Sequence, residues 1–198
     1  MSGYQNFYRL FKPKTFVASK EIASKFKLQN ALASNFVIPS FFKGVYYVPS
    51  QRERKGRFIE KPSEFFIDLF NFIYGQSGWY WSLSTAARFY GLEWSSGRIL
   101  EVVVAIKSKK IDIVARVASL ENKKSYRSKV LSGILSTLGI NFVIIHKGKK
   151  DSLKEVTFDS EIGSVATKSR MIKDIELFLS KTRSRPQRRL YRAIISRI

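Results

Sequence analysis

The sequence predicts an α+β fold, and three observations carry this prediction. Two segments with a helical spacing of apolar residues, 19–26 and 28–35, precede a glycine-containing apolar hairpin at 41–50. Beyond residue 62, aliphatic runs typical of buried strands alternate with amphipathic helices. Residues 181–198 are basic and helical in spacing. We therefore expect an N-terminal winged helix-turn-helix, a small mixed α/β domain and a basic C-terminal helix.

The composition is that of a globular and strongly cationic protein. Hydrophobic residues make up 44% and aromatic residues 14% of the 198 residues, enough for one domain or two small ones. The 36 lysines and arginines outnumber the 15 acidic residues, giving a net charge of +21. Such an excess favours polyanionic partners, above all nucleic acid, because each phosphate contact releases counterions. A ribosomal or other highly charged surface is the alternative explanation.

Several other classes of protein are excluded or disfavoured. The chain has no cysteine, which rules out disulfides, thiolate chemistry and cysteine-ligated zinc. Its N-terminus lacks the apolar core of a signal peptide, and no apolar run approaches the ~20 residues that span a bilayer. We therefore expect a cytoplasmic protein with no membrane partner and no cofactor.

The charge is unevenly distributed along the chain. Residues 1–61 carry twelve basic and three acidic side chains, whereas residues 62–100 carry two and three and hold eleven aromatic residues. Residues 181–198 hold seven basic residues and no acid. This pattern predicts polyanion-facing surfaces at both ends of the chain. The predicted segments are 1–61, 62–180 and 181–198, and a polar, basic linker at 51–57 marks the first boundary.

The hairpin at 41–50 is the centre of the N-terminal segment. Lys43 and Gly44 form its predicted turn, because Gly44 can adopt a positive φ. Pro49 ends the return strand, because proline has no N–H to donate to a neighbouring strand. Two short helices followed by a hairpin is the order of a winged helix-turn-helix, which reads DNA.

The second short helix stands where a recognition helix would stand. Gln29 and Asn30 can contact adenine edges in the major groove, and Ser34 tolerates several bases. The alternative is that all three are ordinary solvated helix residues. Phosphate contacts are predicted from seven cations, namely Lys20, Lys25, Lys27, Lys43, Arg52, Arg54 and Arg57.

Hydrophobic periodicity predicts the remaining elements. Ser19 is the expected N-cap of the first short helix. The tryptophans Trp79, Trp81 and Trp94 could stack on unpaired bases, but next to a phenylalanine-rich helix they are better explained as core. The other predicted helices cover residues 4–11, 62–73, 82–90, 121–138, 167–179 and 186–198, and the other strands cover 15–18, 79–81, 100–106, 111–117, 140–145 and 156–158.

Two segments resemble one known family. Val45-Tyr46-Tyr47-Val48-Pro49 resembles the G-V-Y-x-x-P wing of AbiEi-type antitoxins. The stretch Trp79-Tyr80-Trp81-Ser82-Leu83-Ser84-Thr85-Ala86-Ala87-Arg88-Phe89-Tyr90-Gly91-Leu92 is similar to that family's Y-x-S-x-x-S-A-x-x-x-G-L segment. A fainter similarity covers residues 165–179, with Ile172-Lys173-Asp174.

The resemblance implies a function for each part of the chain. In AbiEi-type families the N-terminal winged helix represses its own operon, and the C-terminal domain neutralises a nucleotidyltransferase toxin in a type IV toxin–antitoxin system. It therefore implies duplex DNA and a toxin protein as partners, with a homodimer as a further possibility, and a non-enzymatic transcriptional regulator.

Two alternatives of other classes stay open. An RNA-binding or ribosome-associated protein is suggested by the tail, because arginine-rich helices bind structured RNA. A metal-dependent nuclease is suggested by the loose acid–acid–lysine arrangement of Glu101, Asp112 and Lys107. His146, the single histidine, is expected to be structural, so we predict no catalytic or metal-binding residue. The predicted secondary nucleic-acid contacts are Arg183, Arg185, Arg188, Arg189 and Arg192.

Overall fold

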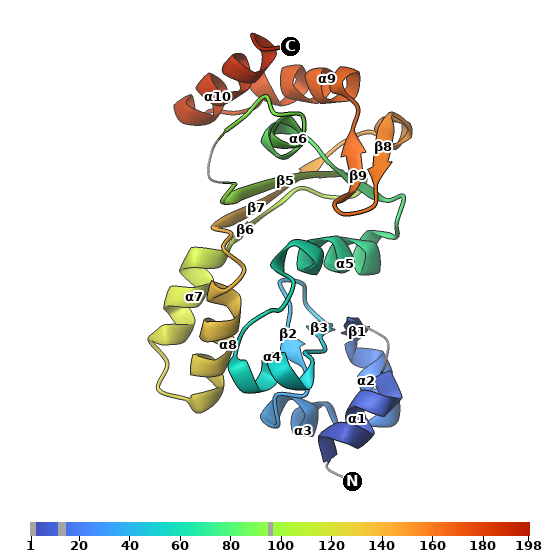
Figure 1. Cartoon of the computed structure of the whole chain (residues 1–198), viewed down its shortest axis with the longest axis vertical. Helices are drawn as coiled ribbons and strands as arrows, with labels where there is room; N and C mark the ends of the chain where they lie inside the picture. Colours follow the sequence, from blue (N-terminus) through green and yellow to red (C-terminus); the bar gives the residue numbers. More distant parts are fainter. Residues whose placement is uncertain (1–2, 12–14, 95–96) are drawn as a thin grey trace. The chain divides into compact units, whose positions relative to one another are not determined.

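The protein forms two compact units that combine helices with β-sheet (Figure 1), which confirms the α+β class. The computed structural model describes residues 3–11, 15–94 and 97–198. Unit 1 contains residues 1–69 and 114–138, and unit 2 contains residues 70–113 and 139–198.

Unit 1 is built from short helices around a three-stranded antiparallel sheet. The strand order is β1-β3-β2, so the return strand of the hairpin is central. Tyr46 lies opposite Val17 on one side and Pro39 on the other. The elements of its first part are α1 (Gly3–Phe11), β1 (Phe16–Ala18), α2 (Ser19–Lys25), α3 (Leu28–Ala33), β2 (Ile38–Pro39) and β3 (Val45–Tyr47).

A hairpin is present around the predicted turn, but its strands are very short and cover residues 38–39 and 45–47 rather than 41–50. Gly44 adopts φ +79°, and the N–H of Ser40 donates to the Val45 carbonyl over 3.0 Å. The prediction of Ser19 as an N-cap is wrong by one residue, because Ala18 occupies that position. The N–H of Ser19 instead donates to the Gly44 carbonyl over 2.8 Å, and this bond joins the hairpin turn to the first residue of α2.

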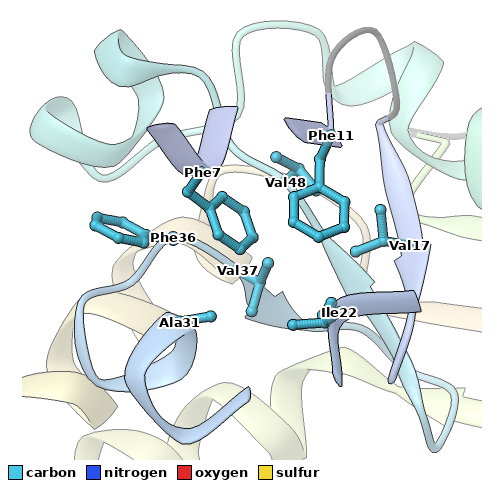
Figure 2. Close-up of a cluster of buried hydrophobic side chains, with 8 residues drawn as sticks. All are labelled: Phe7, Phe11, Val17, Ile22, Ala31, Phe36, Val37 and Val48. Atoms are coloured by element: carbon cyan, nitrogen blue, oxygen red, sulfur yellow. The ribbon is translucent and has the colours of Figure 1, made fainter. Parts of the chain in front are cut away.

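One cluster of apolar side chains holds α1, α2 and α3 to the three-stranded sheet (Figure 2). Phe7 and Phe11 lie four residues apart on one face of α1, with ring centroids 4.5 Å apart. Each buried side chain of this size contributes about 1.5–3 kcal/mol relative to exposure, so the cluster makes a large contribution to the stability of this part. Its buried members are Phe7, Phe11, Val17, Ile22, Ala31, Phe36, Val37 and Val48.

The predicted linker at 51–57 is wrong, because these residues form helix α4 (Gln51–Gly56). Ser50 and Glu53 make a capping box, in which each side chain accepts a backbone N–H of the other residue. Glu53 also accepts the Tyr47 hydroxyl over 2.7 Å, and burial together with this bond raises the pKa of Tyr47. The polar composition of these residues led to the prediction of a linker, but the local hydrogen bonds of the capping box stabilise a helix there.

Two further helices belong to unit 1 and correct the prediction for residues 111–138. The strand predicted at 111–117 is wrong, because a short strand β6 (Lys109–Asp112) is followed directly by α7 (Ile113–Glu121). The single helix predicted at 121–138 begins only at α8 (Tyr126–Ser136). Ser125 caps α8 by accepting the N–H of Ser128 over 3.2 Å, and this cap explains the break.

Unit 2 contains a six-stranded mixed sheet with the order β6-β7-β5-β4-β9-β8. The neighbouring strands β5 and β7 are parallel, and β4 pairs antiparallel with β5 and parallel with β9. Strand β9 had not been predicted, because Gly163 and Ser164 have low strand propensity although the strand is fully buried. Besides β6, the strands are β4 (Trp79–Trp81), β5 (Ile99–Val104), β7 (Phe142–Lys147), β8 (Val156–Asp159) and β9 (Gly163–Ala166).

Three helices of unit 2 lie on the same face of this sheet (Figure 1), namely α6 (Leu83–Phe89), α9 (Lys168–Leu179) and α10 (Arg185–Ile195). Tyr191 and Ile194 of α10 are fully buried, so the predicted basic segment at 181–198 packs as part of unit 2. The helix α5 (Pro62–Tyr74) belongs to unit 1 up to Leu69, and a short 3₁₀ helix covers Lys150–Lys154.

No helix in the described part of the chain combines the length and the apolar character that crossing a bilayer requires.

Candidate nucleic-acid interface

The predicted DNA-contacting lysines lie at the surface of unit 1. Lys20 and Lys25 of α2, Lys27 between the two helices and Lys43 in the hairpin turn are all exposed. The bond from the Ser19 N–H to the Gly44 carbonyl joins residues adjacent in sequence to Lys20 and Lys43. The structure therefore brings these two lysines, 23 positions apart in the chain, to neighbouring backbone positions.

Helix α3 presents polar groups in its first turn. Gln29 and Asn30 are exposed, whereas Ala31, the next residue, is buried in the core of unit 1. Ser34 forms the exposed C-cap of the same helix. One face of α3 thus anchors the helix, and the other leaves two carboxamide groups open to a partner.

The three predicted arginines of α4 and its C-cap make contacts within unit 1. Arg52 pairs with Glu60 at 3.5 Å, in a partly exposed ion pair worth little in stability. The Arg54 guanidinium lies 5.3 Å from the centre of the Phe36 ring. Arg57 lies 5.1 Å from the Tyr126 ring centre and donates to its hydroxyl over 3.3 Å. Any phosphate that bound these arginines would compete with those contacts.

A cavity of about 240 Å³ in unit 1 has the opposite charge to the lysine surface. Glu53, Glu60, Glu64 and Asp68 contribute to its walls. Burial, with the charge of Glu64, raises the pKa of Asp68. Phosphate would be repelled from this side of unit 1.

Sequence reasoning missed a further group of cations in unit 1. The residues between α7 and α8, and the start of α8, expose Lys123, Lys124, Arg127 and Lys129. They were not predicted as nucleic-acid contacts, because a long continuous helix was predicted there. Charged residues on such a helix form an ordinary solvated face. Their clustering in sequence was the available signal.

The predicted secondary contacts lie on and before α10 of unit 2. Arg183, Arg185 and Arg188 are exposed, as are Arg189 and Arg192. The opposite face of α10 carries the buried Tyr191 and Ile194.

The three residues of the nuclease alternative differ in burial. Asp112 and Lys107 are exposed, whereas Glu101 is 1% exposed on the central strand β5. In the described ranges, no group of three or more potential metal-ligating His, Cys, Asp or Glu side chains occurs.

Glu101 instead accepts hydrogen bonds from three elements of unit 2. Its Oε2 accepts the backbone N–H of Ser84 over 3.1 Å and the Ser84 hydroxyl over 2.6 Å. Its Oε1 accepts the Tyr191 hydroxyl over 2.5 Å and the Gln187 amide over 3.1 Å. His146 Nε2, which sequence reasoning left without a partner, lies 3.2 Å from the same oxygen. This Glu101 network joins α6, β5, β7 and α10.

The Glu101 network predicts a loss of stability in acid. Burial alone would raise the pKa of Glu101, but the hydrogen bond and charge of His146, with bonds from Ser84 and Tyr191, lower it below 4.5. A lowered folded-state pKa stabilises the fold above pH 4.5, and this contribution is lost as the pH falls through the folded-state pKa. The free energy of unfolding of Glu101→Gln should therefore approach that of the wild-type chain as the pH falls through the folded-state pKa of Glu101. A difference between the two chains that does not shrink anywhere in an acid titration would contradict this assignment.

A second buried carboxylate fixes α9 in unit 2. Asp174 accepts the hydroxyls of Tyr80 and Ser82 over 2.9 and 2.8 Å and pairs with Arg170. Both segments carry the family resemblance, but local pattern could not pair them, because Asp174 lies 94 positions from Tyr80 and 92 from Ser82.

Comparisons with protein-family models, with curated proteins and with solved structures each found no match above the significance threshold. Functional conclusions about this chain therefore depend on its own residues and geometry.

Proposed function

We propose that unit 1 is a winged helix-turn-helix that docks on duplex DNA, and that the protein is a transcriptional regulator of its own operon. The observation that carries the proposal is the bond between Ser19 and Gly44, which places the Lys43 turn beside the start of α2. A lysine-bearing turn and a lysine-bearing helix start could then contact one DNA backbone together.

The order of elements supports the proposal. Unit 1 runs α1, β1, α2, α3, β2 and β3, and β3 lies between the other two strands. Two short helices followed by an antiparallel hairpin is the order expected of this DNA-binding fold. The strands β2 and β3 are only two and three residues long, so the wing would be a short one.

The exposed residues would make two kinds of contact with DNA, one to phosphates and one to bases. Lys20, Lys25, Lys27 and Lys43 would contact phosphates, and such contacts provide affinity without sequence information. Gln29 and Asn30, on the first turn of α3, would enter the major groove and donate and accept at adenine edges. Arg54 and Arg57 would mainly hold unit 1 together through their aromatic contacts.

Base reading by α3 predicts a measurable preference between duplexes. The protein should bind the duplex upstream of its own gene more tightly than a scrambled duplex of the same length. Each good bidentate contact to a base provides about 1–3 kcal/mol of discrimination, so Gln29→Ala with Asn30→Ala should remove most of that preference. Fluorescence anisotropy at one fixed salt concentration measures both duplexes.

The matched control is Gln5→Ala, which removes an exposed carboxamide from α1. It should leave the preference unchanged. If the Gln29/Asn30 variant discriminates between the duplexes as well as the wild-type chain does, α3 is not the recognition helix.

The toxin-neutralising role implied by the resemblance to AbiEi-type antitoxins stays a prediction for unit 2. Co-purification of the full chain with the product of the neighbouring gene tests it.

A further inference from the structure

Unit 2 displays one tryptophan to solvent and buries the other two. Trp94 is 83% exposed, whereas Trp79 and Trp81 on β4 are 1% and 4% exposed. The prediction that all three tryptophans are core residues is thus wrong for Trp94. A large aromatic ring left in water is typical of a binding surface, where tryptophan is enriched.

The segment that leads to Trp94 is held in place. The N–H of Leu92 donates to the Ala87 carbonyl over 2.8 Å, and Arg197 donates to the Leu92 carbonyl over 2.8 Å. Glu93 pairs with Arg88 at 3.6 Å, and both side chains are largely buried. Trp94 therefore follows an anchored stretch of chain, close to the residues that end α10.

Helix α10 presents a ridge of arginines, and Arg197, two residues beyond its end, donates to the Leu92 carbonyl of this segment. At about 100° per residue, Arg185, Arg188, Arg189 and Arg192 fall within an arc of roughly 100° on one side of the helix. Gln187, Tyr191 and Ile194 occupy the opposite side, where Tyr191 and Gln187 bind Glu101. The arginine ridge is thus fixed in orientation by the buried face of its own helix.

The residue types of unit 2 differ from those of the proposed DNA surface. The cations proposed to contact phosphate in unit 1 are lysines, whereas the ridge contains arginines only. Guanidinium groups are planar, stack on unpaired bases and bind phosphate through two parallel hydrogen bonds, which a lysine ammonium cannot do. An exposed indole adds a second stacking surface, and bases that can stack in this way are those of single strands.

We infer that Trp94 and the arginine ridge of α10 form a binding surface for single-stranded RNA. An unpaired base stacks on Trp94, and the adjoining phosphates bind Arg188 and Arg192. This surface consists of residues of unit 2, and the inference does not depend on the duplex-binding surface proposed for unit 1.

Tryptophan emission of the full chain tests the inference, with a 12-nucleotide uridine RNA as the probe. Because Trp79 and Trp81 are buried, stacking should quench only the Trp94 part of the emission, and the quenching should saturate. Binding of labelled RNA, followed by anisotropy, should weaken roughly tenfold in Trp94→Ala and much less in Trp94→Phe, which keeps a ring. The double variant with Arg188 and Arg192 both replaced by alanine loses two phosphate contacts. The slope of log affinity against log salt should therefore fall by about 1.4, at about 0.7 for each contact to a single strand.

One control separates this surface from unit 1. A variant with Lys20, Lys27 and Lys43 replaced by alanine should bind the RNA as the wild-type chain does, whatever its effect on duplex DNA. Equal RNA affinity in Trp94→Ala and the wild-type chain would overturn the inference. So would loss of RNA binding in the lysine variant.

Discussion

Replacing Glu101 by alanine is expected to cost unit 2 roughly 3–5 kcal/mol, because removing one partner of a buried charged network leaves the other groups without their acceptor. The Ser84 N–H, the Tyr191 hydroxyl and the Gln187 amide all donate to this carboxylate. Single domains are stable by only about 5–15 kcal/mol, so a loss of this size removes a large part of the total. Chemical denaturation followed by circular dichroism measures it.

The expected consequence is greatest for α10. Tyr191 and Gln187 bond α10 to Glu101 of β5, so loss of this carboxylate should let α10 dissociate before the sheet unfolds. Hydrogen exchange of residues 185–195 should therefore accelerate in Glu101→Ala. Glu176→Ala, which removes an exposed carboxylate from α9, is the matched control and should change stability by less than about 0.5 kcal/mol. A similarly small effect of Glu101→Ala would show that the network contributes little.

The second large effect concerns affinity for duplex DNA. Replacing Lys20, Lys27 and Lys43 by alanine should weaken binding several hundred-fold at ~0.1 M salt, because each phosphate contact contributes about 0.9 to the slope of log affinity against log salt. The slope should accordingly fall by about 2.7, by the same amount for every duplex sequence. Anisotropy titrations at four or more salt concentrations measure both quantities.

The control for this variant removes the same charge elsewhere. Lys107, Lys149 and Lys150 are exposed residues of unit 2, and their replacement by alanine lowers the net charge by the same three units. If the two triple variants lower the slope equally, general charge rather than the proposed docking surface governs binding.

Secondary structure was predicted correctly from the sequence where it depends on residues close together in the chain. The Gly44 turn, the amphipathic helix α9 and the proline-initiated helix α10 were predicted because turns and hydrophobic periodicity involve neighbouring residues. The helix α4 was missed although its Ser50–Glu53 capping box is also local. There the basic composition was given more weight than the cap.

Long-range partners could not be predicted in the same way. Glu101 and Tyr191 are 90 positions apart, and only the parallel pairing of β5 with β7 brings His146 beside Glu101. The grouping of residues 114–138 with unit 1 likewise has no signal in local pattern. Of the candidate site, the exposed lysines and carboxamides could be identified from sequence, but the engagement of Arg54 and Arg57 with aromatic rings could not.

The central claim is that duplex DNA covers the lysines of α2 and of the hairpin turn. Acetylation of the full chain with and without a saturating duplex, read residue by residue by mass spectrometry, tests this claim most directly. The proposal predicts that Lys20, Lys25, Lys27 and Lys43 lose reactivity when DNA is bound, while Lys149 and Lys150 keep it. Protection confined to unit 2 or to Lys123, Lys124 and Lys129, with Lys20 and Lys43 still reactive, would contradict it.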